Sequence, residues 1–209
     1  MKVTKYIHSC LLVESDGKVA IFDPGSMSRQ AFDINTLNQL DYIFITHIHA
    51  DHMDLDFIKD LVSKFPEVKI ISTEEVIKEL AKNNITAQSK PTSDVSFFDS
   101  PHENVQPLFS QPQEIGIHYL NKLSNPGDSH SFKETKEVLA LPITAPWGSS
   151  INALKLALEL KPKYIIPIHD WHWSDAARKQ SYNGYAQLLA DKGITFYKPE
   201  TGVPIEIPV

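Results

Sequence analysis

Residues 42–54 read YIFITHIHADHMD, and this stretch is the starting point for interpreting the chain. Its apolar beginning predicts a strand over Tyr42–Thr46 that is buried on both faces. Four side chains with metal-binding atoms follow directly: His47, His49, Asp51 and His52. Imidazole nitrogens and carboxylate oxygens are ligands of zinc, manganese and iron. A strand that ends in such a loop predicts a metal site.

The spacing inside this HxHxDH motif favours two ions over one. His47 and His49 are two residues apart, so both side chains can converge on the same ion. Asp51 and His52 are adjacent, and as the chain turns they can reach a second ion. The alternative is a solvated histidine-rich turn, but the strand in front of the motif supplies the structural context that a metal site needs.

The bulk composition is that of an ordinary soluble globular protein. The 209 residues are 42% hydrophobic and 22% charged, so we expect a single domain over 1–209 with a large core. The net charge of -6 argues against a nucleic-acid partner, which usually meets a basic face. A small anionic substrate remains compatible, because bound metals reverse the local sign of a site.

The cysteine content and the N-terminus favour a cytoplasmic protein. Cys10 is the only cysteine, so an intrachain disulfide is impossible, and its apolar surroundings predict a core position. The N-terminal residues MKVTKYIHSCLLVESDG contain no signal-peptide-like apolar segment. No stretch approaches the roughly 18 apolar residues of a membrane-spanning helix. We therefore expect no membrane association.

The order of predicted elements suggests two packed sheets with helices outside. Asp16-Gly17 is a hairpin signal, and Asp54 and Thr73 are predicted helix N-caps. The predicted strands are Val3–His8, Cys10–Glu14, Lys18–Phe22, Tyr42–Thr46, Val68–Ser72, Val95–Phe98, Ile115–Leu120, Glu137–Leu141, Lys163–Ile168, Thr195–Tyr197 and Val203–Ile207. The predicted helices are Leu55–Phe65, 73–83, Ile151–Leu160 and Ala176–Asp191.

Three further segments place ligand-type side chains in turns or at the ends of predicted strands. Pro101-His102-Glu103 comes shortly after the Val95–Phe98 strand. Pro126-Gly127-Asp128-Ser129-His130 reads as a turn, and Pro167-Ile168-His169-Asp170 closes the strand Lys163–Ile168. A pair of ions needs more ligands than the motif alone provides, and these segments offer them.

Taken together, these motifs resemble the metallo-β-lactamase-fold hydrolase superfamily. The chain looks most like its compact single-domain branch, which is related to lactonases and small metal-dependent hydrolases. The resemblance spans nearly the whole chain. It rests on an opening IHS, a strand ending in Asp23-Pro24-Gly25, the segment DYIFITHIHADHMD, an isolated histidine, a Gly-Asp turn and a strand ending in Pro-x-His.

The resemblance implies an α/β (α+β) fold, a four-layer αββα sandwich, with the site at one edge of the sheets. It also implies two divalent metal ions, zinc by preference, with manganese or iron as alternatives. Carried over by position, His47, His49 and His102 would hold the first metal, Asp51, His52 and His169 the second, and Asp128 would bridge both. A bridging water or hydroxide would be the nucleophile, and Asp51 would also hold it in line, which makes Asp51 the catalytic candidate.

Several positions around these ligands remain open from the sequence alone. His118 and His130 are rivals of His102 for the first metal, and His130 is also a candidate for the pocket lining. Asp23 and Asp41 are candidates for the carboxylates that hydrogen-bond metal-bound imidazoles. His8 is a candidate for the pocket. Trp147 and Trp171 are candidates for flat substrate walls, although core packing or a homo-oligomer interface would also account for them.

The favoured function is hydrolysis of an ester, lactone or phosphodiester in a small-molecule substrate by a dinuclear metal-dependent enzyme. One alternative is a catalytically silent metal-binding sensor or scaffold of the same fold. A di-iron redox protein is less favoured, because redox members of the superfamily usually have Glu where this chain has His49 and carry additional domains.

Overall fold

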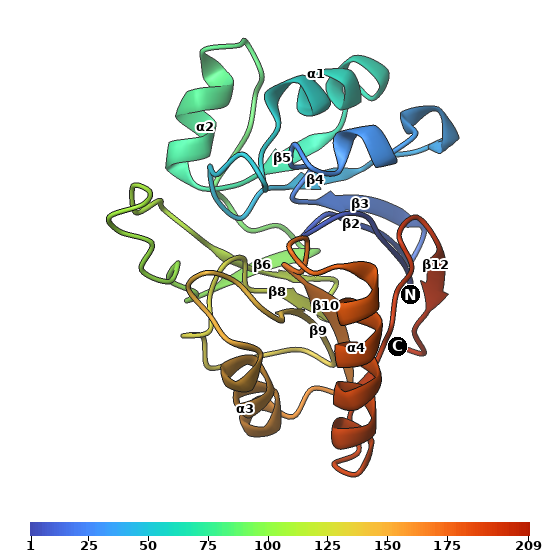
Figure 1. The fold of residues 1–209 in the computed structure, drawn as a ribbon. Coiled ribbons are helices and arrows are strands. Elements are labelled where there is room, and N and C mark those ends of the chain that lie inside the picture. The colour runs from blue at the N-terminus through green and yellow to red at the C-terminus, as the bar shows by residue number, and fades with distance from the viewer.

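The computed structural model describes residues 1–209, which form two six-stranded mixed sheets packed face to face (Figure 1). The first sheet has the order β12-β1-β2-β3-β4-β5 and the second the order β11-β10-β9-β8-β7-β6. The first sheet consists of β1 (Lys2–Lys5), β2 (Leu11–Ser15), β3 (Lys18–Phe22), β4 (Tyr42–Phe44), β5 (Lys69–Ile71) and β12 (Pro204–Glu206). The second consists of β6 (Val95–Phe98), β7 (Gly116–Tyr119), β8 (Leu123–Asn125), β9 (Val138–Pro142), β10 (Tyr164–Ile168) and β11 (Thr195–Phe196).

Four helices cover the outer faces of the two sheets. The helices α1 (Leu55–Lys64) and α2 (Glu74–Ala81) lie on the first sheet, and α3 (Ser150–Leu160) and α4 (Asp175–Ala190) lie on the second (Figure 1). Each helix begins where a side-chain oxygen accepts a backbone N–H: Asp54, Thr73, Ser149 and Ser174 are the N-caps. Two short 3-10 helices, Arg29–Ala31 and Ile34–Thr36, lie between β3 and β4. The predicted αββα sandwich is confirmed.

Three apolar clusters fill the spaces between these four layers. The cluster between the sheets includes Phe22, Phe44, Tyr119 and Ile166. A second cluster joins the first sheet to α1 and α2, with Ile43 and Leu61 among its members. A third cluster joins the second sheet to α3 and α4. Alternate residues of one strand therefore serve two clusters, as Ile43 and Phe44 of β4 illustrate.

The parallel strands bring the chemically interesting loops to one edge. The strands β3, β4 and β5 are parallel to one another, as are β8, β9 and β10 in the second sheet. Loops that follow parallel neighbours leave the same edge of a sheet. The loops after β3, β4, β8 and β10 carry the turn at residue 23, the HxHxDH motif, Asp128 and His169, respectively.

Two details of the fold differ from the sequence-based prediction. The first strand ends at Lys5, not at His8, because residues 6–10 form a turn closed by a hydrogen bond from Tyr6 N–H to the carbonyl of Cys10. The short strand β8 was not predicted, because Leu123–Asn125 is too brief for a periodic signal. Cys10 is buried in the core as predicted. No helix combines the length and apolar character needed to span a membrane.

Candidate metal centre

The HxHxDH loop leaves β4 and is held by the turn that follows β3. The backbone N–H of Ser26 donates to the carbonyl of Ala50, and the N–H of Asp54 donates to the carbonyl of Pro24. Within the loop, His52 N–H donates to the carbonyl of His49. Backbone hydrogen bonds therefore hold the middle of the loop, at Ala50, and its C-terminal end, at Asp54.

Gly25 is the point of closest approach between this turn and the metal-binding loop. A Cβ atom added at Gly25 would collide with the carbonyl of Asp51 and would lie 2.7 Å from the backbone nitrogen of His52. Both neighbours are backbone atoms, so neither can move without displacing the ligands they carry. This contact explains why the strand β3 must end in a turn that contains glycine.

We expect Gly25→Ala to weaken metal binding and to lower the free energy of unfolding by about 1–3 kcal/mol, the usual cost of forcing an extra group into a packed site. Metal affinity by competition with a chelating dye and stability by urea unfolding would measure both effects. Gly184→Ala in α4 is the control, because a Cβ there meets no atom within 4 Å beyond the nearby backbone of its own helix; it should leave metal affinity unchanged and should not lower stability. Unchanged metal affinity in the Gly25 variant would contradict this description of the loop.

The structure brings the first predicted set of three histidines together. The nearest ring nitrogens of His47, His49 and His102 all lie within 4.8 Å of one another. His47 and His102 are buried and His49 is partly exposed. The Nε2 atoms of His47 and His102 are buried and have no hydrogen-bond partner.

A second group contains the predicted Asp51, His52 and His169 and adds His8. The ligand atoms of these four side chains also lie within 4.8 Å of one another. His8 Nε2 lies 3.0 Å from Asp51 Oδ2, and the rings of His8 and His169 have centroids 4.0 Å apart. His8 therefore contacts a proposed metal ligand directly and does more than line the pocket.

Asp128 lies between the two groups. Its Oδ1 is 3.1 Å from His52 Nε2, and its Oδ2 is 3.0 Å from His169 Nε2 and 3.8 Å from His102 Nε2. One carboxylate therefore faces imidazoles of both sets. The indole Nε1 of Trp147 donates to Asp128 Oδ2 over 3.2 Å, which places Trp147 as a partly exposed wall beside the site.

Two fully buried carboxylates support the histidines from behind. Asp23 Oδ2 lies 3.1 Å from His52 Nδ1, and Asp23 also accepts the backbone N–H of Thr46. Glu114 Oε2 lies 2.9 Å from His47 Nδ1 and accepts the backbone N–H of Asp128 over 2.8 Å. Each carboxylate binds Nδ1 and leaves Nε2 to face the centre, the arrangement by which carboxylates orient metal-binding imidazoles.

Glu114 was not among the sequence-based candidates, and its loss tests this arrangement. We expect Glu114→Gln to lower metal affinity by about 10- to 100-fold, the usual cost of losing a carboxylate behind a ligating histidine. Glu134→Gln is a matched control, because that carboxylate is largely exposed and faces His118 outside the centre. Equal metal affinity in the Glu114 variant and the wild type would contradict the supporting role.

Three site residues have backbone conformations that side chains other than glycine seldom adopt. His8, Asp23 and His169 have φ values of 64, 46 and 61°. Such conformations are uncommon for non-glycine residues and collect at functional sites. His169 also donates its backbone N–H to the carbonyl of His8 over 3.3 Å, so two of these turns are joined directly.

The electrostatics of the cluster favour neutral imidazoles at His47 and His8 and an ionised Asp128. Burial lowers the pKa values of His52 and His169, but the neighbouring Asp128 outweighs burial and raises both. Burial and the neighbouring His52 hold the pKa of His47 well below its ordinary value, and burial and His169 lower the pKa of His8 to about 4. Burial raises the pKa of Asp128, but His169 and His52 outweigh it and hold that pKa well below its ordinary value. Neutral imidazole and carboxylate are the forms that ligate metals.

The buried atoms at the centre fit divalent cations. The Nε2 atoms of His47 and His102 are buried without a hydrogen-bond partner, and His52 Nε2 has only Asp128 Oδ1 beside it, at 3.1 Å. Leaving such atoms unpaired costs free energy, so a group of them that points inward calls for a ligand. Nitrogen and oxygen donors in this number suit zinc, manganese or iron.

The remaining sequence candidates lie outside this centre. His118 of β7 stacks on Phe98 and forms a hydrogen bond with Ser124 of β8. The ring of His130 lies against Trp147, and His130 Nε2 lies 2.7 Å from the carbonyl oxygen of Pro142. Neither joins His47 and His49, whereas His102 does.

The expectation for Asp41 needs correction. It lies at the opposite end of β4 from His47, where its carboxylate accepts Val19 N–H and the amide of Gln39. It therefore supports a turn at the far edge of the sheet and orients no ligating imidazole. Trp171 is 47% exposed and borders a neighbouring cavity.

A buried ionic network lies directly behind His169. Asp170 is fully buried and accepts from Lys5 Nζ over 2.8 Å, from Arg178 Nε over 2.9 Å and from the hydroxyl of Tyr182. Lys5 is the last residue of β1, and Arg178 and Tyr182 belong to α4. The network therefore ties the end of β1 and the start of α4 to the loop that carries His169.

Known proteins resemble this chain over most of its length. Residues 2–169 match the family described as "Beta-lactamase superfamily domain". Protein Rv0786c of Mycobacterium tuberculosis is 28% identical over 182 residues, covering 81% of this chain and 84% of the relative. A UPF0173 metal-dependent hydrolase of Flavobacterium johnsoniae is 39% identical over 90 residues, covering 42% of this chain and 38% of the relative.

A solved structure shares the fold over almost the full length. The crystal structure of a putative metal-dependent hydrolase from Parabacteroides distasonis superposes with a TM-score of 0.70 at 20% identity. The match covers 95% of this chain and 93% of that one. At this level of identity the likeness establishes a common architecture.

Proposed function

The chain belongs to the β-lactamase superfamily and has the metallo-β-lactamase fold, and from this premise we propose that it is a metal-dependent hydrolase with a dinuclear centre. Its substrate is a small molecule that contains an ester, lactone or phosphodiester bond. The observation that carries the proposal is Asp128, a single carboxylate that faces histidines of two neighbouring ligand groups. The name "metal-dependent hydrolase" of the Flavobacterium relative supports it.

The residues divide into two ligand sets on this proposal. His47, His49 and His102 would hold one ion, Asp51, His52 and His169 would hold the other, and Asp128 would be shared between them. Zinc is the proposed metal, with manganese or iron as alternatives, because donors of this kind accept all three. Two divalent cations in such a set supply an activated water as nucleophile and stabilise the negative charge that develops on the substrate.

The protein's own contribution is to fix the donors before the substrate arrives. Glu114 and Asp23 hold the rings of His47 and His52 by Nδ1, so that Nε2 is presented to the centre. His8 holds Asp51 by one carboxylate oxygen, and the Asp51 side chain keeps 27% of its surface exposed. Partial exposure of His49 and Asp51 gives a substrate access to both ligand groups.

Aromatic side chains border the open side of the centre. The rings of Phe109 and His49 have centroids 5.9 Å apart, and Phe109 is 61% exposed. Trp147 lies on another side and contacts Asp128. Such surfaces suit the apolar part of an organic ester better than a fully hydrated ion.

Removal of the metal is the direct test of this function. We expect the zinc-loaded protein to hydrolyse at least one member of a panel of aryl esters, lactones and aryl phosphodiesters. Activity should disappear with a chelator and return when zinc, manganese or ferrous iron is added back. Turnover that survives complete metal removal would refute the proposal.

Paired variants connect the activity to the ligands. His169→Ala should lose both activity and bound metal, whereas His172→Ala is the control, because His172 lies outside both ligand groups. If the metal-loaded protein binds small molecules tightly but turns over none of the panel, the alternative of a metal-binding sensor is favoured instead.

A further inference from the structure

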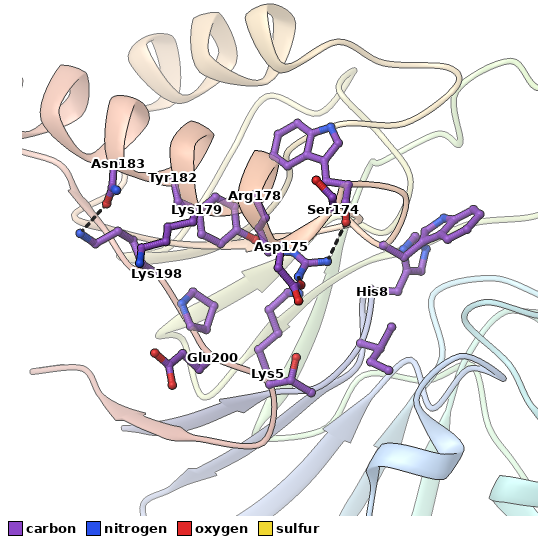
Figure 2. Close-up of a pocket in the computed structure, with 15 residues that line it drawn as sticks. Lys5, His8, Ser174, Asp175, Arg178, Lys179, Tyr182, Asn183, Lys198 and Glu200 are labelled. Carbon is purple, nitrogen blue, oxygen red and sulfur yellow. Dashed lines mark hydrogen bonds and ion pairs between the residues drawn. The ribbon is translucent and has the colours of Figure 1, made fainter.

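A cavity of about 990 Å³ lies between α4, the end of β1 and the segment 198–201 that precedes β12 (Figure 2). Its volume is at the upper end of the range for small-molecule sites. His8 lies at one end and Lys198 lies beside Asn183 at the other, so the cavity is elongated (Figure 2). None of the metal ligands proposed above lines it, which makes it a separate feature of the molecule.

One end of this cavity adjoins the metal centre. His8 lines it and also contacts Asp51, a proposed ligand of the second metal. Trp171 lines the same cavity and follows His169 by two residues. The buried His8 is therefore shared by the metal centre and the cavity, and the exposed Trp171 lies beside it at the cavity rim.

The charge of the cavity contrasts with that of the whole chain. The protein has a net charge of -6, yet four cations line the cavity: Lys5, Arg178, Lys179 and Lys198. Asp170 beneath it is shared by Lys5 and Arg178, and Asp175 pairs with Arg178 at a position where its own side chain is 98% exposed. Glu200 is the other lining carboxylate.

Two lysines keep their charge available to a ligand. Lys198 Nζ contacts only the neutral amide oxygen of Asn183, over 3.0 Å, and Lys179 has no hydrogen bond or ion pair in the structure. The two residues come from different elements, α4 and the segment before β12, and face the same cavity (Figure 2). Both side chains are exposed, and their two charges together attract an anion to this end of the cavity.

We propose that this cavity binds the anionic part of the substrate, a carboxylate or a phosphate carried on an organic group. This inference rests on the proposed function, because it assigns the substrate class of the same centre. The scissile bond lies at the metals, the apolar or ring-bearing part passes Trp171, and the anion lies between Lys179 and Lys198. Arg178 and Lys5 are balanced by Asp170 and Asp175, so the attraction for the anion comes from Lys179 and Lys198.

Binding measurements on the zinc-loaded protein test the inference without relying on turnover. The probes are phenyl phosphate, benzoate and phenol, which share a ring and differ in charge, and affinity is measured by isothermal titration calorimetry. We expect at least one of the two anions to bind and phenol to bind much more weakly. Comparing phenyl phosphate with benzoate distinguishes a phosphate-bearing from a carboxylate-bearing substrate.

Reversing the charge of the two cavity lysines then tests whether the anion binds beside them. In Lys179→Glu/Lys198→Glu the affinity for the preferred anion should fall by about tenfold or more, because two attractive charges become repulsive. Lys59→Glu/Lys192→Glu is the matched control, since it changes the net charge equally at exposed lysines outside the cavity. The control should retain wild-type affinity.

Three outcomes would overturn the inference. They are equal affinity in the cavity variant and the wild type, an equal loss in the control variant, and binding of phenol as tight as that of both anions. Each is independent of the hydrolase proposal, which fails only if turnover survives metal removal. An anion held solely by the metals would give the first of these outcomes.

Discussion

Asp128→Asn is expected to lower hydrolysis by about a thousandfold or more, beyond the 10- to 100-fold loss that follows removal of a supporting carboxylate behind a metal ligand. The reason is geometric. Its two oxygens face His52 on one side and His169 and His102 on the other. An amide of the same shape keeps one oxygen but lacks the charge and the second oxygen, so it cannot serve both ligand sets. Steady-state kinetics and metal content of the same preparation measure the effect.

Asp41→Asn is the matched control for this experiment. Asp41 was a sequence-based candidate for the centre, but its carboxylate accepts hydrogen bonds from Val19 and Gln39 at the other end of β4. Its substitution should leave activity and metal content per folded molecule unchanged. If both variants lose activity equally, or if neither does, Asp128 does not have the proposed role.

Asp170→Asn is expected to reduce the free energy of unfolding by about 3–5 kcal/mol, because removing one charge of a buried pair leaves the other without compensation. Lys5 is only 5% exposed and Asp170 is fully buried, so water cannot replace the lost partner. The network also holds the loop behind His169, so metal affinity should fall as well. Urea unfolding with and without metal separates the two effects.

Asp175→Asn provides the control from the same network. Its carboxylate also pairs with Arg178, but the side chain is 98% exposed. An exposed pair of this kind contributes little, about 0–1 kcal/mol. A similar small loss in both variants would mean that the Asp170 network is not an important source of stability.

Much of the architecture could be predicted because local signals agree with the final fold. The apolar run of β4 and the caps Asp54 and Thr73 mark element boundaries that the structure reproduces to within a few residues. Asp16-Gly17 has positive φ at both positions, as its hairpin signal requires. The proximity of the HxHxDH residues could be predicted too, because their spacing confines them to one loop.

Other residues reach the centre through tertiary contacts, and no local sequence pattern predicts such contacts. Glu114 lies in an irregular segment, and only the packing of that segment against Thr46 and Asp128 brings its carboxylate to His47. His8 reaches the second ligand group because the chain leaves β1 early and adopts a left-handed conformation. Asp41 shows the opposite error, a candidate that is close in sequence and distant in space. It comes just before β4 and the HxHxDH motif comes just after it, so the two lie at opposite edges of the sheet.

The central claim is that one shared carboxylate joins two metal sites. Crystals grown with zinc and measured on both sides of the zinc absorption edge test it most directly. The account predicts two anomalous peaks, one among His47, His49 and His102 and one among Asp51, His52 and His169, with Asp128 in contact with both. A single peak, or two peaks that do not share Asp128, would contradict it.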